Sequence, residues 1–110
     1  MLKRLELPPC PVEISLILFG DRWKLLIVHR LLKGTKRFGE LRKSLLGISP
    51  KVLTQHLRLM EEYGLVEKEI FAEVPPRVEY SLTELGRNLK TILDAMYDYG
   101  KHYKKTITLD

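Results

Sequence analysis

The side chains best suited to chemistry lie in residues 47–66, GISPKVLTQHLRLMEEYGLV. Ser49 is a good N-cap, Pro50 suits the first position of a helix, and Gly64 is a typical C-terminal stop. These signals predict a single helix. Its apolar residues recur at helical spacing and form one stripe, made by Leu53, Leu57 and Met60 with His56 at its edge.

The opposite side of this helix is polar and carries no acid. Lys51, Gln55 and Arg58 fall within about 60° of one another on a helical wheel, with Thr54 at the edge. Gln55 suits adenine N6 and N7, and Arg58 suits guanine or a phosphate. The helix N-terminus, at Ser49 and Pro50, can approach a phosphate through a backbone N–H. The pattern favours a helix that reads DNA, although a solvated polar face is the alternative.

Positive charge is concentrated around this helix. The 110-residue chain has a net charge of +5, but residues 22–58 hold ten lysines and arginines against one acid, Glu40. That segment therefore carries +9 and the rest of the chain −4. Such segregation fits a polyanionic partner and a merely solvated basic surface about equally. Because the basic block coincides with the helix described above, we expect the partner to be double-stranded DNA. The residues expected to contact the DNA backbone are Lys36, Arg37, Arg42 and Lys43, with Glu40 as an alternative partner for Arg37.

Other kinds of site are not indicated. A single cysteine, Cys10, excludes an internal disulfide, and the histidines stand too far apart for zinc spacing. The sequence contains no phosphate-binding glycine motif and no nucleophile elbow. We therefore expect no enzyme activity, metal or cofactor. The apolar run at residues 14–19 is too short to span a bilayer, so we expect a cytoplasmic protein without a membrane partner.

The flanking pattern predicts the elements that position the helix. Two helices are expected first, over residues 11–18 and from Asp21 to about residue 33, with Trp23 in the core. A short strand at residues 36–38 and a third helix reaching residue 46 follow. The tight turn that comes next makes a helix-turn-helix.

After Gly64 the apolar period becomes alternating, which predicts two strands over residues 65–72 and 78–82 around a tip at residues 74–77. A hairpin in this position is a wing. Its strands are rich in glutamate, so we expect only Arg77, at the tip, to touch DNA.

The last predicted helix is too long for its own domain. It runs over residues 83–105 with Thr83 as its cap, and about twenty helical residues span roughly 30 Å. One apolar, aromatic end must therefore project, and pairing with a second copy would bury it. The alternative is a helix folded flat over its own domain. The expected dimer interface consists of Ile14, Leu18, Leu89, Ile92, Leu93, Met96, Tyr99 and Tyr103.

The fold class that follows is α+β and mainly helical: a winged helix-turn-helix with a C-terminal dimerisation helix. We expect one domain over residues 1–110. It divides into an arm with a short dimerisation helix (1–20), the winged core (21–82) and the dimerisation helix (83–105).

Cys10 stands immediately before the first helix. The partial positive charge of a helix N-terminus would stabilise a thiolate there and raise its reactivity. As the only cysteine, it would act through an adduct or a mixed disulfide, or by bridging two subunits. The alternative is a small buried residue that packs beneath the dimerisation helix.

Six blocks of this sequence resemble the HxlR-type bacterial transcriptional regulators. In order along the chain they are CPVE (10–13), DRWK (21–24), RFGEL (37–41), GISPKVLT (47–54), EVPPRVEY (73–80) and SLTELG (81–86). The resemblance implies a dimeric winged helix-turn-helix that binds operator DNA as repressor or activator. It also implies that the cysteine of the first block senses electrophiles or oxidants in some members. Two departures are Asp21–Arg22 in place of glycine–lysine, and Tyr99 where tryptophan is frequent.

A second hypothesis comes from a different class of function. A winged-helix module can serve protein–protein contact without binding an operator. The sequence names neither the operator nor a small-molecule effector.

Overall fold

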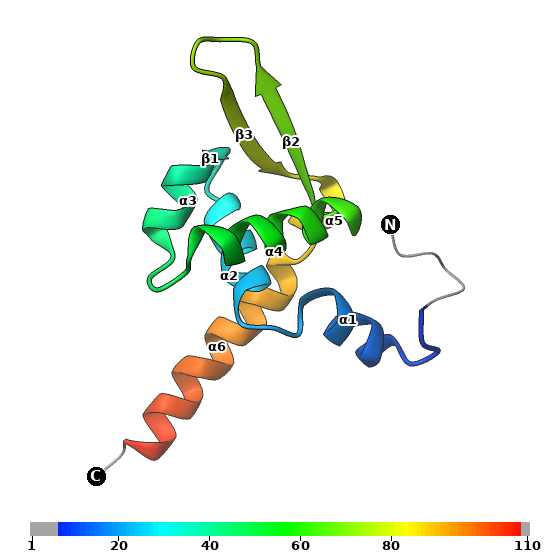
Figure 1. Ribbon diagram of the computed structural model, residues 1–110. Helices are drawn as coiled ribbons and strands as arrows, with labels where there is room; N and C mark the ends of the chain where they lie inside the picture. Colours follow the sequence, from blue (N-terminus) through cyan, green and yellow to red (C-terminus); the bar gives the residue numbers. More distant parts are fainter. Residues whose placement is uncertain (1–6, 109–110) are drawn as a thin grey trace.

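The computed structural model describes residues 7–108, and their elements follow the predicted order (Figure 1). Residues 1–6 of the expected arm, and residues 109–110, lie outside this range. The elements are α1 (Pro11–Phe19), α2 (Trp23–Leu31), β1 (Lys36–Arg37), α3 (Phe38–Ser44), α4 (Pro50–Glu62), β2 (Val66–Phe71), β3 (Arg77–Leu82), α5 (Glu84–Arg87) and α6 (Lys90–Ile107). The predicted winged helix-turn-helix is confirmed, with α3 and α4 as its helix pair and β2–β3 as its wing.

The core lies between α2, α3, α4 and the base of the hairpin. Its fully buried side chains are Ile27 and Val28 of α2, Leu41 of α3, Leu45 just after α3, and the predicted stripe of α4, Leu53, Leu57 and Met60. Trp23, which we expected as a buried anchor, is only partly buried and packs against the edge of this cluster. The apolar stripe of α4 therefore determines which side of that helix faces solvent.

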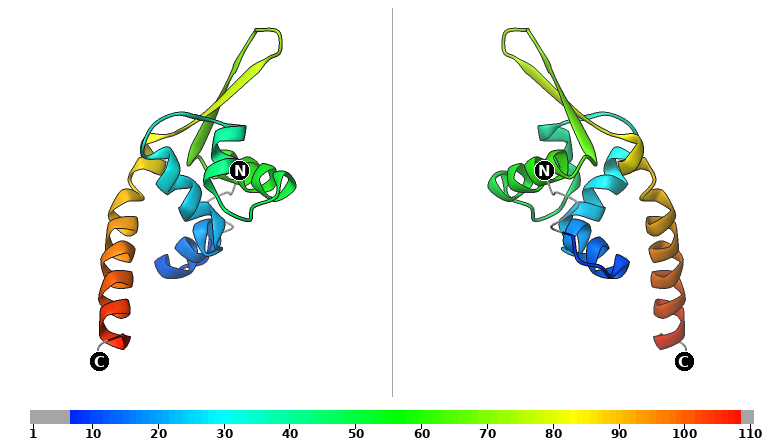
Figure 2. Two further views of the ribbon diagram at one scale, coloured as in Figure 1. Left: turned by 90° about the vertical axis from the view of Figure 1, so that its left-hand side faces the viewer. Right: turned by 90° about the vertical axis from the view of Figure 1, so that its right-hand side faces the viewer.

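Three antiparallel strands form a small sheet in the order β1–β3–β2. Val66 pairs with Leu82 at the base of the hairpin, and Phe71 pairs with Arg77 near its tip. Figure 2 shows the hairpin and α6 projecting from opposite ends of the molecule. The wing and the C-terminal helix are thus the two extensions of one central core.

The predicted ends of α4 are correct. The Ser49 hydroxyl accepts a hydrogen bond from the backbone N–H of Val52 at 3.1 Å, as an N-cap should. Gly64 follows α4 with φ +77°, a left-handed conformation that glycine adopts without strain. Helix α2 begins at Trp23, slightly later than predicted, yet the Asp21 carboxylate accepts hydrogen bonds from the N–H groups of Trp23 and Lys24, at 2.8 and 2.9 Å.

The prediction of one continuous C-terminal helix is wrong, because the helix ends at Arg87 and a new helix, α6, begins at Lys90. Thr83 caps only the short α5, accepting from the N–H of Gly86 at 3.0 Å and donating to the Gly64 carbonyl at 2.6 Å. Gly86 lies so close to Leu65 that an added Cβ would stand 2.1 Å from the Leu65 carbonyl oxygen. This contact fixes α5 against the base of the wing, and α6 leaves the core in its own direction.

Candidate DNA-binding surface

The polar side of α4 is open to solvent along its whole length. The side chains expected to contact bases, Lys51, Thr54, Gln55 and Arg58, are all exposed, and so are Ser49 and Pro50 at the helix start. The Thr54 hydroxyl donates to the carbonyl of Pro50 at 2.8 Å, which turns it back onto the helix. Lys51, Gln55 and Arg58 thus remain as the longer side chains available to a groove.

Basic side chains of β1 and α3 lie beside this helix. Arg37, Arg42 and Lys43 are exposed, and Lys36 is partly buried in the sheet. Glu40 accepts a hydrogen bond from the backbone N–H of Arg37 at 2.8 Å, so its carboxylate caps α3 rather than pairing with the guanidinium. The Arg37 side chain stays exposed, as a phosphate contact requires.

The wing cation Arg77 has partners within the hairpin. Its guanidinium lies 4.0 Å from the centre of the Phe71 ring and forms ion pairs with Glu73 at 3.1 Å and Glu79 at 3.6 Å. Only 28% of its side chain is exposed. Two carboxylates neutralise the one cation expected to reach DNA from the wing, and the cation instead ties the two strands together.

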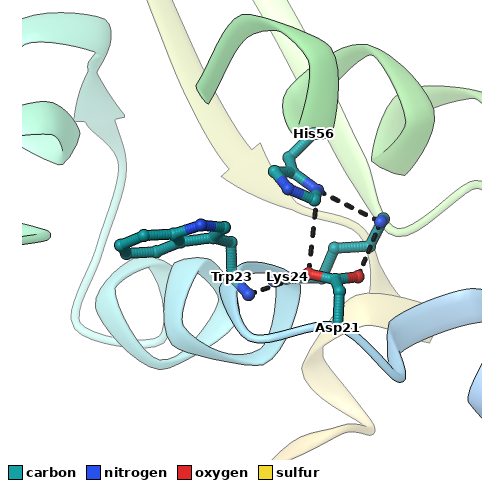
Figure 3. Close-up of polar contacts among 4 residues, drawn as sticks. All are labelled: Asp21, Trp23, Lys24 and His56. Atoms are coloured by element: carbon teal, nitrogen blue, oxygen red, sulfur yellow. Dashed lines mark hydrogen bonds and ion pairs between the residues drawn. The ribbon is translucent and has the colours of Figure 1, made fainter. Parts of the chain in front are cut away.

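One polar cluster was not found from the sequence. Lys24 counted as part of the basic block, but it is buried, with 5% of the residue exposed. Its Nζ lies 2.7 Å from Asp21 Oδ2 and 3.1 Å from His56 Nδ1, and His56 Nδ1 lies 3.7 Å from Asp21 Oδ1 (Figure 3). This Asp21–Lys24–His56 cluster joins the turn before α2 to the edge of α4. Residue spacing gave no signal of it, because His56 is far from the other two in the sequence.

The cluster changes the ionisation of both partners of Lys24. Burial alone would raise the pKa of Asp21, but hydrogen bonds from the Lys24 side chain and from two backbone N–H groups hold that pKa below its usual value. Burial and the nearby Lys24 ammonium lower the pKa of His56, against a smaller opposing effect of Asp21. At neutral pH the imidazole is therefore neutral, and its Nδ1 can accept the hydrogen bond from Lys24.

A second surface is formed by the apolar side chains of α6 and α1. Met96 is 52% exposed and Tyr99 67%, and Ile92 and Tyr103 are exposed beside them. Leu93 is partly buried, as are Ile14 and Leu18 of α1. Leu89 was expected here, but it lies in the chain's own core with 7% exposed, so it is not available to a partner.

The exposed side of α1 differs from the one we expected. Val12 and Leu16, rather than Ile14 and Leu18, lie open to solvent, and they line a groove that Ile92 and Met96 of α6 complete. Cys10 precedes this helix as its N-cap residue and is exposed, in contrast to the buried alternative.

No group of three or more histidine, cysteine, aspartate or glutamate side chains within residues 7–108 is arranged to hold a metal ion. No helix in the same range is both long and apolar enough to cross a membrane.

Comparison with known proteins gives consistent matches over most of the chain. Residues 18–108 match the family model described as HxlR-like helix-turn-helix. The HTH-type transcriptional regulator YdeP of Bacillus subtilis is 44% identical over 98 residues, which cover 89% of this chain and 77% of YdeP. YodB, another HTH-type transcriptional regulator of that organism, is 36% identical over 95 residues, covering 86% of this chain and 85% of YodB.

Solved structures agree with these matches. The redox regulator HypR in its reduced form superposes with a TM-score of 0.84 at 39% identity, covering 89% of this chain and 97% of HypR. The reduced form of YodB gives a TM-score of 0.74 at 35% identity, over 87% of this chain and 95% of YodB. All four matched proteins or structures are named as regulators, not as enzymes.

The lowered pKa of His56 predicts a pH dependence of stability. Near its ordinary pKa of 6.5, an unfolded chain binds more protons at this residue than the folded one. The free energy of unfolding should therefore fall as the pH drops from about 6.5 through the lower folded pKa, and level off below it. The lowered pKa of Asp21 acts only at more acidic pH, below its ordinary value of 3.8.

Urea unfolding at a series of pH values measures this effect. His56→Asn should flatten the curve in that window. Equal curves for wild type and His56→Asn would contradict the assignment.

Proposed function

The chain belongs to the HxlR-like helix-turn-helix family of transcriptional regulators, and we propose that it binds operator DNA as a homodimer through α4. The observation that carries this proposal is the division of α4 into a fully buried apolar stripe and an exposed, acid-free polar face. A helix so anchored can enter the major groove without losing its packing.

Gln55 and Arg58 are the proposed base readers, with Lys51 beside them and Thr54 at the edge. A glutamine amide can make two hydrogen bonds to adenine, and an arginine can make two to guanine. The start of α4, at Ser49 and Pro50, approaches a phosphate through a backbone N–H other than that of Val52, which donates to Ser49; Pro50 itself has no N–H.

The backbone contacts come from β1 and α3 rather than from the wing. Arg37, Arg42 and Lys43 are exposed next to α4, and Lys36 lies at the edge of the sheet. Arg77 would have to exchange Glu73 and Glu79 for a phosphate, so its contribution to DNA affinity is small. Exposed glutamates on β2 also disfavour a close approach of this strand to phosphates.

Dimerisation uses the exposed apolar side of α6 and α1. The 18 residues of α6 span about 27 Å, and only its first turns pack on the core, as Leu89 and Leu93 do. Figure 2 shows its far end standing clear of the other elements. A second copy would bury Ile92, Met96, Tyr99 and Tyr103, together with Val12 and Leu16, and would place two copies of α4 on one duplex.

Cys10 is the proposed thiol of a chemical response. It is exposed at the start of α1, beside the proposed dimer interface. Of the proteins that this chain resembles, HypR is a redox regulator with a structure in its reduced form, and YodB has structures in reduced and diamide-treated forms. Addition of this thiol to a quinone forms a C–S bond in place of a C=C π bond, passes the thiol proton to the quinone and needs no external oxidant; the adduct would place a new group next to α1.

Substitution of the proposed readers tests DNA recognition. Against a duplex that the wild type selects from a random library, Gln55→Ala and Arg58→Ala should each weaken binding by about 1–3 kcal/mol and relax the preference at one base position. Fluorescence anisotropy at one salt concentration measures this. Lys105→Ala, at the end of α6, is the control, and unchanged affinity of both reader variants would instead favour a protein–protein module.

A charge in the apolar patch of α6 tests the dimer. Met96→Asp would bury a carboxylate in the proposed interface, so sedimentation should show monomers at concentrations where the wild type is dimeric. Lys101→Asp lies on the opposite side of α6 and should leave the dimer intact. A wild type that sediments as a monomer would refute the proposed assembly.

The response of Cys10 is tested with a quinone. Treatment should change the operator affinity of the wild type and add one adduct by mass spectrometry, whereas Cys10→Ser should keep its affinity. The same change in both proteins would remove Cys10 from the proposal.

A further inference from the structure

The cluster formed by Asp21, Lys24 and His56 reaches the edge of the DNA-facing side of α4. His56 directly follows Gln55, and its imidazole points away from the polar face toward α2 (Figure 3). The contact with Lys24 at 3.1 Å joins residues that are distant in sequence and sit on two different helices. It is the only side-chain hydrogen bond between α2 and α4 within residues 7–108.

The hydrogen bond between Lys24 and His56 restrains α4 directionally, which burial of its apolar stripe does not do. Leu53, Leu57 and Met60 set the side of α4 that faces the core, by burial that is not itself directional. A hydrogen bond depends steeply on distance and angle. With side chains extending about 5–6 Å from the helix axis, a rotation of about 20° moves their ends by about 2 Å. A shift of that size would move a side chain out of hydrogen-bond range of the base that it contacts.

The other end of the cluster is held firmly. Lys24 Nζ donates to Asp21 Oδ2, while Asp21 Oδ1 accepts from two backbone N–H groups of α2. Asp21 directly follows Gly20, which ends α1. The side chain that fixes His56 is therefore attached to the junction between α1 and α2.

We propose that Lys24 and His56 are positioning residues, which hold α4 at the rotation that the operator requires, and that Asp21 orients Lys24. Neither residue touches DNA: Lys24 is buried, and His56 faces α2. This inference rests on the proposed operator binding. It adds that sequence discrimination depends on a contact behind the helix, next to the element that leads to the dimer interface.

Loss of a positioning residue and loss of a phosphate contact should change DNA affinity in different ways. Loss of a phosphate contact weakens binding to every sequence and lowers the slope of log affinity against log salt by about one. Loss of positioning should weaken binding to the selected duplex while affinity for a random duplex and the salt slope stay unchanged. Lys24→Met and His56→Leu should each reduce selected-duplex affinity about tenfold.

Two further variants separate positioning from a general loss of structure. The side-chain oxygen of His56→Asn can occupy the place of Nδ1 and accept from Lys24, so it should restore most of the affinity that His56→Leu loses. The double variant Lys24→Met/His56→Leu should bind no more weakly than the weaker single variant, because both remove one contact. His29→Leu, an exposed histidine on α2, should bind as the wild type does.

Anisotropy titrations of the full chain with both duplexes decide the outcome, with urea unfolding to confirm that each variant is folded. Folded Lys24→Met and His56→Leu proteins that discriminate between the duplexes as well as the wild type would overturn the inference. So would an equal loss of affinity for both duplexes, or a His56→Asn variant no better than His56→Leu. A wild type that shows no preference between duplexes would instead refute the proposed function itself.

Discussion

Burial of the apolar stripe of α4 is the interaction on which the rest of the structure depends. Leu53, Leu57 and Met60 are fully enclosed by α2, α3 and the base of the wing, and their helical spacing leaves the opposite side of α4 in solvent. That one constraint presents Lys51, Gln55 and Arg58 together in solvent. The long side chains of the proposed DNA-binding surface are therefore presented by the packing of the opposite side of α4, and they remain exposed themselves.

Much of this arrangement could be predicted because its causes are local in the sequence. Ser49, Pro50 and Gly64 mark the ends of α4, and the change from helical to alternating period marks the wing. The break between α5 and α6 could not be predicted, because it follows from the approach of Gly86 to the Leu65 backbone, which only the folded chain creates. Thr83 was correctly expected as a cap, but of a helix that ends after one turn.

The charge pattern of the sequence was a poor predictor of which individual lysines and arginines are free to contact DNA. Residues 22–58 carry an excess of positive charge, yet Lys24 is buried against Asp21 and His56, and Arg77, in the wing, is held by two glutamates. The partners of Arg77 follow from the hairpin register, whereas those of Lys24 depend on how two helices pack. Of the cations expected to contact DNA, those that stay exposed are Arg37 of β1, Arg42 and Lys43 of α3, and Lys51 and Arg58 of α4.

The most direct test of the account is a hydroxyl-radical footprint of the wild-type protein on DNA from upstream of its own gene or a neighbouring one. Two copies of α4 on one face of a duplex should protect two half-sites whose centres lie about 34–36 Å apart, one helical turn, or a multiple of that distance. Protection of two such phased half-sites is the result we predict. Uniform weak protection along the fragment, or a single unpaired half-site, would contradict a dimer that reads its operator through α4.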